Sequence, residues 1–99
     1  MLLGKVIGTV WSTRKDEALV GAKFLIVRQL DLDYKPKDST VIAVDSVGAG
    51  VGEIVIVAQG SSARQTTITK NKPVDAVIMA IVDKLDISIK DNNKKTVDT

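Results

Sequence analysis

The sequence lacks two residue types on which much enzyme chemistry depends. Its 99 residues include no cysteine and no histidine, and its only aromatic residues are Trp11, Phe24 and Tyr34. Without cysteine there is no disulfide, no thiolate nucleophile and no zinc site built on sulfur. Without histidine, Ser61 and Ser62 have no imidazole to activate them as nucleophiles. We therefore expect these serines to satisfy backbone groups in a turn.

Long hydrophobic runs and a strong net charge are also missing. No apolar run approaches the roughly 20 residues of a membrane-spanning helix, and the amino terminus lacks the two regions typical of a signal peptide. Lys and Arg number 14 against 12 Asp and Glu, a formal charge of +2. This bias is too weak to indicate nucleic acid. We expect a soluble cytoplasmic protein that folds as one domain, because a chain of this length supports a single core.

What is present is a hydrophobic fraction of 44%, supplied mainly by Val, Ile, Leu and Ala, which favours an aliphatic, strand-rich core. Alternation of apolar and polar residues predicts a first strand, in which Gly4 and Gly8 permit the coiling of a small closed barrel. Charges and Pro36 indicate an exposed turn over residues 31–39. The predicted strands in this part of the chain cover residues 2–11, 22–30, 41–44 and 54–57.

The later part of the chain changes period. Residues 66–72 fit either a short strand or an extended loop. Apolar residues at spacings of three and four then predict one short helix over residues 73–82, with Pro73 and Asp75 in its first turn. Alternation returns over residues 85–89 and predicts a last strand. We assign residues 1–89 to one domain and expect residues 90–99 to form a frayed polar tail.

A glycine loop between two apolar runs is the most distinctive local feature. Gly48, Gly50 and Gly52 alternate with Ala49 and Val51. A dinucleotide fingerprint would place its third glycine where Glu53 stands, and a strand rather than a helix follows. A P-loop ending in Gly-Lys-Ser/Thr is absent. The loop therefore favours a structural use, in which glycines provide positive φ or allow another chain to approach closely.

Two carboxylates bracket this loop. Asp45 and Glu53 fit either a general acid and base or acceptors for loop N–H groups and for Arg64, whose planar fork suits a carboxylate. We favour the structural alternative. Asp31 and Asp33 resemble the start of a calcium loop, but Lys35 stands where the next ligand is needed. The sequence thus predicts no metal and no cofactor.

These stretches carry a resemblance to a known family. The strongest agreement lies in residues 43–53, 60–64, 75–76 and 81–83. Weaker agreement lies in residues 4–6, 13–15 and 19–23. Together they resemble the vertex proteins of bacterial microcompartment shells, the family named after EutN of ethanolamine-utilisation compartments and CcmL of carboxysomes.

The resemblance implies a mainly β fold: an OB-like barrel of about five strands with one short α-helix. It implies a homopentamer that caps five-fold vertices of a microcompartment shell, beside hexameric shell proteins, with no enzymatic role. From the composition we also expect no nucleic-acid or membrane partner. Trp11 departs from the family, in which a small residue is common at that position. The candidate interface or vertex-loop residues are Asp45, Gly48, Ala49, Gly50, Gly52, Glu53, Gly60, Ser61, Ser62, Arg64 and Asp83.

Two other classes of function stay as alternatives. An OB-type nucleic-acid-binding module would stack bases on aromatic side chains and follow the phosphates with a basic groove. Three aromatic residues and a charge of +2 equip the chain poorly for that task. A small enzyme is a weaker alternative, because neither histidine nor cysteine is available.

Overall fold

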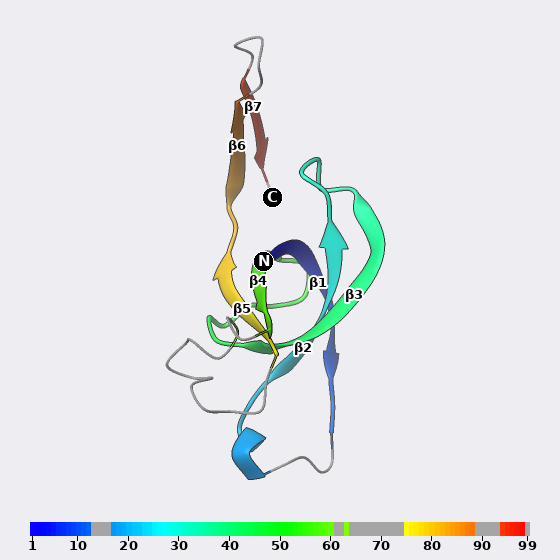
Figure 1. Cartoon of the computed structure of the whole chain (residues 1–99), viewed down its shortest axis with the longest axis vertical. Coiled ribbons are helices and arrows are strands. Elements are labelled where there is room, and N and C mark those ends of the chain that lie inside the picture. Colours follow the sequence, from blue (N-terminus) through cyan, green and yellow to red (C-terminus); the bar gives the residue numbers. More distant parts are fainter. Residues whose placement is uncertain (13–16, 61–62, 64–74, 89–93, 99) are drawn as a thin grey trace.

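Five strands close a barrel in the order β1-β2-β3-β5-β4 (Figure 1). The computed structural model describes residues 1–12, 17–60, 63, 75–88 and 94–98, the last of these ranges by its backbone alone. The barrel strands are β1 (Leu2–Val10), β2 (Phe24–Leu30), β3 (Pro36–Asp45), β4 (Ile54–Gln59) and β5 (Ala76–Ile81). A short 3-10 turn, η1 (Glu17–Leu19), lies between β1 and β2.

The barrel closes through one parallel and four antiparallel pairings. Strands β3 and β5 run parallel, with Val44 opposite Val77. All other neighbours in the barrel are antiparallel, including β1 with β4. This order is that of a small five-stranded OB-type barrel. The predicted mainly β class is confirmed.

Glycine in β1 allows the strand to coil between two partners. The register of β1 against β2 shifts between Val6 and Gly8. A Cβ atom at Gly4 would overlap the Val27 side chain and lie 2.9 Å from the Arg28 carbonyl oxygen. No larger residue fits at Gly4 without moving the backbone of β2.

Side chains are buried both inside the barrel and on part of its outer surface. A second buried cluster joins Val44, Ala58, Ala63 and Val77 on the other face of β3, β4 and β5, and Phe24 packs against it. The aliphatic interior that the composition predicts is confirmed. It consists of Val6, Leu25, Val27, Ala43, Ala49, Val55, Val57, Ala76 and Ile78.

The predicted helix over residues 73–82 is wrong. Residues 76–81 form β5, and the described residues contain no α-helix. Ala76, Val77 and Ile78 are all buried, because β5 packs one face into the barrel and the other against the second cluster. A strand buried on both faces reads as a continuous apolar run, which does not distinguish a strand from a helix.

Strand β3 begins earlier than the sequence predicts. The segment over residues 31–39, expected to be a turn, is exposed apart from the partly buried Asp31 and Tyr34, but pairing starts at Pro36, opposite Leu30. The turn itself is shorter and is closed by Asp31, whose Oδ1 accepts hydrogen bonds from the N–H groups of Asp33 and Lys35 at 2.8 and 3.0 Å. The alternatives for residues 66–72 lie outside the described residues.

The carboxyl-terminal strands form a separate two-stranded sheet. Strand β6 (Lys84–Ser88), close to the predicted strand over residues 85–89, pairs antiparallel with β7 (Lys94–Asp98). A strand thus lies where a frayed tail was expected. In Figure 1, β6 continues upward from β5 and the β6–β7 pair projects beyond the barrel. The principal extents are 52 × 24 × 22 Å.

Candidate functional site: the loop between β3 and β4

Asp45 holds the first half of the loop between β3 and β4. As the last residue of β3, it places its carboxylate beside the N–H groups that follow the strand. Its Oδ1 accepts hydrogen bonds from Val47, Gly48 and Ala49, at 3.1, 3.1 and 3.2 Å. An Asp side chain that binds the N–H groups of the following residues stabilises a tight turn. The loop therefore bends around one carboxylate oxygen.

Glu53 holds the second half in the same manner. Its Oε1 accepts a hydrogen bond from the Gly50 N–H at 2.7 Å, and its own N–H donates to the Gly50 carbonyl at 3.2 Å. Both carboxylates thus bind loop N–H groups, as the structural alternative predicts. The arrangement fits a scaffold for the backbone rather than a general acid and base.

The loop is tied to the barrel at several points. The Gly52 N–H donates to the Val6 carbonyl at 2.8 Å, and the Val6 N–H donates to the Glu53 carbonyl at 3.0 Å. Ala49 is fully buried within the barrel core. The loop therefore covers one end of the barrel and completes its interior.

Two hydrogen-bond donors in this site escaped the sequence analysis. The Lys23 Nζ donates to the Ala49 carbonyl at 3.1 Å, and the Ser46 hydroxyl donates to the Ile78 carbonyl at 2.6 Å. The only sequence signal for Lys23 is its place in residues 19–23, one of the stretches that resemble the family. Ser46 follows Asp45 directly, but nothing in its spacing indicates a partner on β5.

Positive φ accounts for two of the three loop glycines. Gly48 and Gly52 have φ of 78° and 95°. Gly50 lies outside the positive-φ region, and a Cβ atom there would lie 3.5 Å from Glu53 Oε1, in ordinary contact. Val47 and Val51 are 40% and 65% exposed. The loop therefore exposes apolar side chains, while hydrogen bonds to Asp45, Glu53 and the barrel hold its backbone.

Two further candidate residues are Asp83, which lies near this loop, and Gly60, which follows β4. Asp83, in the turn between β5 and β6, lines a hollow of about 210 Å³ together with Gly52 and Glu53. Gly60, directly after β4, has φ of 65° and donates its N–H to the Asp75 carbonyl at 2.7 Å. The structure thus brings Asp83 beside the loop. Ser61, Ser62 and Arg64 lie outside the described residues.

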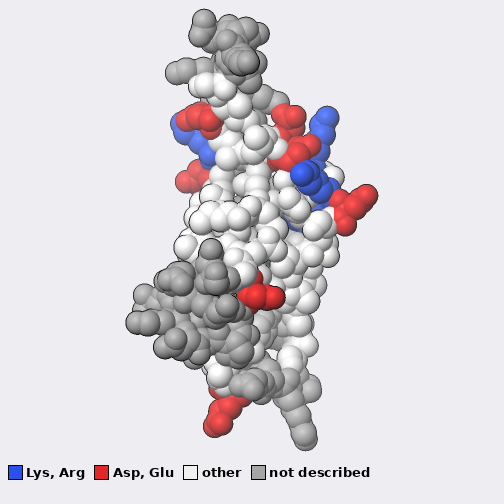
Figure 2. Space-filling model, viewed as in Figure 1, with Lys and Arg blue, Asp and Glu red and all other residues white. Residues whose placement is uncertain are grey.

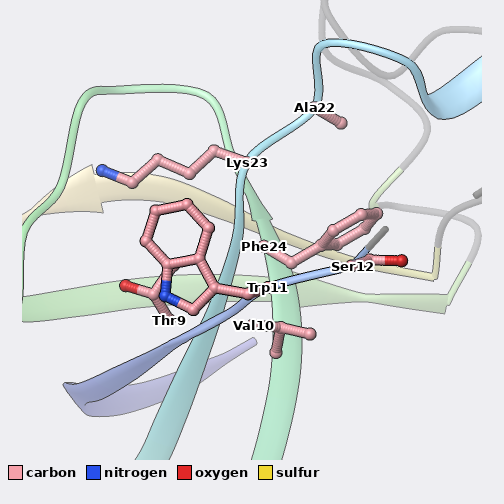
Figure 3. A pocket seen from close by; sticks show the side chains of 7 residues that line it. All are labelled: Thr9, Val10, Trp11, Ser12, Ala22, Lys23 and Phe24. Atoms are coloured by element: carbon pink, nitrogen blue, oxygen red, sulfur yellow. The ribbon is translucent and has the colours of Figure 1, made fainter. Parts of the chain in front are cut away.

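A larger hollow lies at the neighbouring ends of β1 and β2 (Figure 3). It measures about 630 Å³, and Trp11 at its edge is 90% exposed. The Trp11 indole and the Lys23 side chain extend to one side in Figure 3, and Phe24 extends to the other. Lys23 links this hollow to the loop through its bond to Ala49. The site residues predicted from the sequence do not include this surface, although Trp11 departs from the family pattern.

The described ranges contain neither a cluster of metal-ion ligands nor a membrane-spanning helix. No group of three or more His, Cys, Asp or Glu side chains suited to a metal ion lies there. In the same part of the chain, no helix has the length and hydrophobicity to span a membrane.

Comparison with known proteins agrees with this geometry. The family model for ethanolamine utilisation protein EutN/carboxysome matches residues 1–83. The bacterial microcompartment shell vertex protein GrpN of Rhodospirillum rubrum is 54% identical over 86 residues, which cover 87% of this chain and 97% of GrpN.

Solved structures give the same result. The GrpN pentameric microcompartment shell protein from Rhodospirillum rubrum superposes with a TM-score of 0.77 over 84% of this chain and 94% of that one, at 54% identity. The CcmL structure from Nostoc sp. PCC 7120 superposes with a TM-score of 0.83 over 86% and 90%, at 42% identity. The chain belongs to the EutN/CcmL family.

Proposed function

We propose that this chain is a structural shell protein whose homopentamers close the five-fold vertices of a bacterial microcompartment. The observation that carries the proposal is the near full-length match to GrpN, a pentameric shell protein, in both sequence and fold. The mechanism is geometric, since a sheet of six-fold tiles closes into a polyhedron only where five-fold units interrupt it. The chain would act in the shell, within the cytoplasm, and not as an enzyme.

The site fits that task. A ring of identical subunits requires a heterologous interface, in which one patch meets a different patch on the next copy. The loop between β3 and β4 presents a surface of glycines and exposed valines whose backbone shape is set within one chain. Figure 2 shows that uncharged residues cover most of the described barrel surface in that view. Depletion of charge is typical of the core of an interface.

We assign the interface to the candidate residues that the sequence analysis names, including Gly50 in this loop and Arg64 after β4. In this proposal Arg64 binds a carboxylate across the subunit boundary, and Gly50 leaves room for the neighbour. Arg64→Glu and Gly50→Trp then dissociate the ring and leave folded monomers. Native mass spectrometry checks both variants, and pentamers of unchanged stability would remove these residues from the interface.

The function itself is tested in two steps. Native mass spectrometry of the purified chain is expected to give the mass of five copies, as the GrpN pentamer suggests. Deletion of the gene is expected to leave shells open or elongated while the encapsulated enzymes keep their activity. A monomeric chain, or closed polyhedral shells in the deletion strain, would overturn the proposal. Capture of hexameric shell proteins by the tagged pentamer tests the partner that we propose.

A further inference from the structure

The β6–β7 pair, which we call the arm, has little support from the described barrel strands. Strands β6 and β7 contact each other extensively, but neither makes comparable contacts with a described barrel strand. Leu85 alone packs against a small cluster at the barrel end. An isolated two-stranded hairpin is at best marginally stable in water. The arm therefore needs a further surface to cover it.

Side chains on β6 alternate between two environments. Leu85 and Ile87 are partly buried, whereas Lys84, Asp86 and Ser88 are exposed. In register, Val97 pairs with Leu85 and Lys95 pairs with Ile87. Because successive strand residues point to opposite faces, Leu85 and Ile87 share one face of β6. On β6 the arm thus has an apolar face, and the register places Val97 and Lys95 opposite its two apolar residues.

The barrel carries an exposed apolar surface of its own, which we call the isoleucine stripe: Ile7, Ile26 and Ile42. Ile26 pairs with Ile42 on one side and with Gly8, next to Ile7, on the other. Ile7 and Ile42 are 48% and 56% exposed. The stripe therefore crosses three neighbouring strands at one level of the outer barrel wall.

Polar residues border this stripe on one side. Lys5, Arg28 and Thr40 occupy the adjoining row of register positions on the same three strands. Lys5 and Thr40 are exposed, and Arg28 is partly exposed. Along this side the stripe ends in polar residues, as an apolar interface centre does where it meets its rim.

The arm and the stripe of one chain do not meet, because β6 and β7 make no extensive contact with β1, β2 or β3. Across its long axis the molecule measures 24 × 22 Å, whereas the arm extends it to 52 Å. Copies packed side by side in a ring would be separated by about one such width, which is less than the length of the molecule with its arm. We propose that the apolar face of the arm packs onto the isoleucine stripe of the next copy around the ring.

This inference rests on the proposed pentamer but names an element outside the family match, which ends at residue 83. The arm and the stripe are two different patches, as a closed ring requires. In the ring, the same contact covers the unsupported arm and the exposed isoleucines. The arm of each subunit then links it to the following one.

A matched pair of variants in the full-length chain tests the contact. Ile87→Asp and Ser88→Asp introduce the same carboxylate at adjacent positions on opposite faces of β6. For Ile87→Asp we expect the concentration at which half of the pentamer dissociates to rise by about tenfold or more, as for an interface hot spot. For Ser88→Asp we expect it to change by less than about twofold, since an exposed site tolerates substitution. Sedimentation velocity over a dilution series measures both.

The partner surface is tested by coupling. Ile42→Asp alone should also weaken the ring, and Ile42→Asp/Ile87→Asp should weaken it by clearly less than the product of the two single effects, since residues in contact are not independent. Circular dichroism of each variant controls for the barrel fold. Fully multiplicative effects, or an Ile87→Asp pentamer as stable as wild type, would overturn the inference while leaving the pentamer itself intact. A monomeric wild type would instead overturn the proposed function.

Cross-linking supplies a measurement that does not depend on the stability of a variant. Because the chain has no cysteine, Ile87→Cys and Ile42→Cys provide unique thiols. Rings assembled from a mixture of the two variants and treated with a short bismaleimide should give covalent dimers on a denaturing gel. Each variant alone should give few dimers. Intact mixed pentamers without covalent dimers would place the arm elsewhere.

Discussion

At the scale of single residues, Asp45 and Glu53 have the clearest task in the molecule. Asp45 binds three backbone N–H groups of the loop and Glu53 binds one, and each acid lies at a junction of that loop with a strand. Removal of a charged acceptor leaves its donors without a protein partner and costs more than the loss of a neutral hydrogen bond. The conformation of the loop therefore depends on these two acids.

Asp45→Ala should lower the free energy of unfolding by about 2 kcal/mol, because one oxygen serves the N–H groups of Val47, Gly48 and Ala49. Asp45→Asn keeps an acceptor at the same place and should cost clearly less. Urea unfolding followed by circular dichroism measures both, at one protein concentration because oligomers gain apparent stability with concentration. Equal stability of Asp45→Ala and wild type would show that the Asp45 carboxylate does not stabilise the loop.

The sequence predicted the role of the two acids in this site better than the contacts of Lys23 and Ser46. Asp45 and Glu53 border a glycine loop, so their binding of nearby N–H groups follows from local spacing. Lys23 and Ser46 bind carbonyls that lie 26 and 32 residues away along the chain. Such contacts depend on which strands become neighbours in the barrel. Spacing within the sequence carries no signal of that kind.

At the scale of elements, β5 is the strand whose surroundings in the barrel outweigh the helical spacing of its apolar residues. Ile78 and Ile81 both belong to the apolar spacing that predicted a helix. In the strand, Ile78 is fully buried and Ile81 is 37% exposed. The position of β5 between the barrel interior and the second cluster decides which of them is buried.

Alanine substitution of Ile78 and of Ile81 distinguishes a strand from a helix in this segment. Ile78→Ala should lower the free energy of unfolding by about 2 to 5 kcal/mol, the range for truncating a fully buried isoleucine. Ile81→Ala should cost less than about 1.5 kcal/mol, since part of that side chain is already in water. Urea denaturation curves measured side by side give the comparison. Similar losses at both positions would contradict the burial pattern of β5.

Strands β1 to β4 were predictable because their local signals agree with their environment. Alternation marks β1, and glycines or charges bound the apolar runs in β2, β3 and β4. Strand β7 gave no such signal, because Lys94 and Lys95 make it read as a solvated tail. Its backbone pairing with β6 supplies hydrogen bonds that its composition does not reveal.

At the scale of the whole molecule, the hollow beside Trp11 is a second exposed surface, distinct from the isoleucine stripe. Trp11 is the only tryptophan of the chain and is 90% exposed. Exposed tryptophans are frequent among residues that dominate binding energy at interfaces. We expect this surface to contact another shell protein rather than to stabilise the fold.

Trp11→Ala should change the free energy of unfolding by less than about 0.5 kcal/mol and should leave the pentamer intact. It should lower the fraction of the chain that copurifies with assembled shells. Leu32→Ala, which truncates another exposed apolar residue far from the hollow, is the control. Equal recovery of Trp11→Ala and wild type with shells would exclude a role for this surface in assembly.

The hydrogen bonds of the β3–β4 loop have a consequence for the speed of assembly. The hydrogen bonds of Asp45 and Glu53 to this loop lie within one chain, so they can form when the subunit folds, before it docks. A preorganised surface loses little conformational entropy on association. Subunit association should then be limited by correctly oriented collisions, and the abundance of this chain relative to other shell proteins would set how quickly a growing shell is closed.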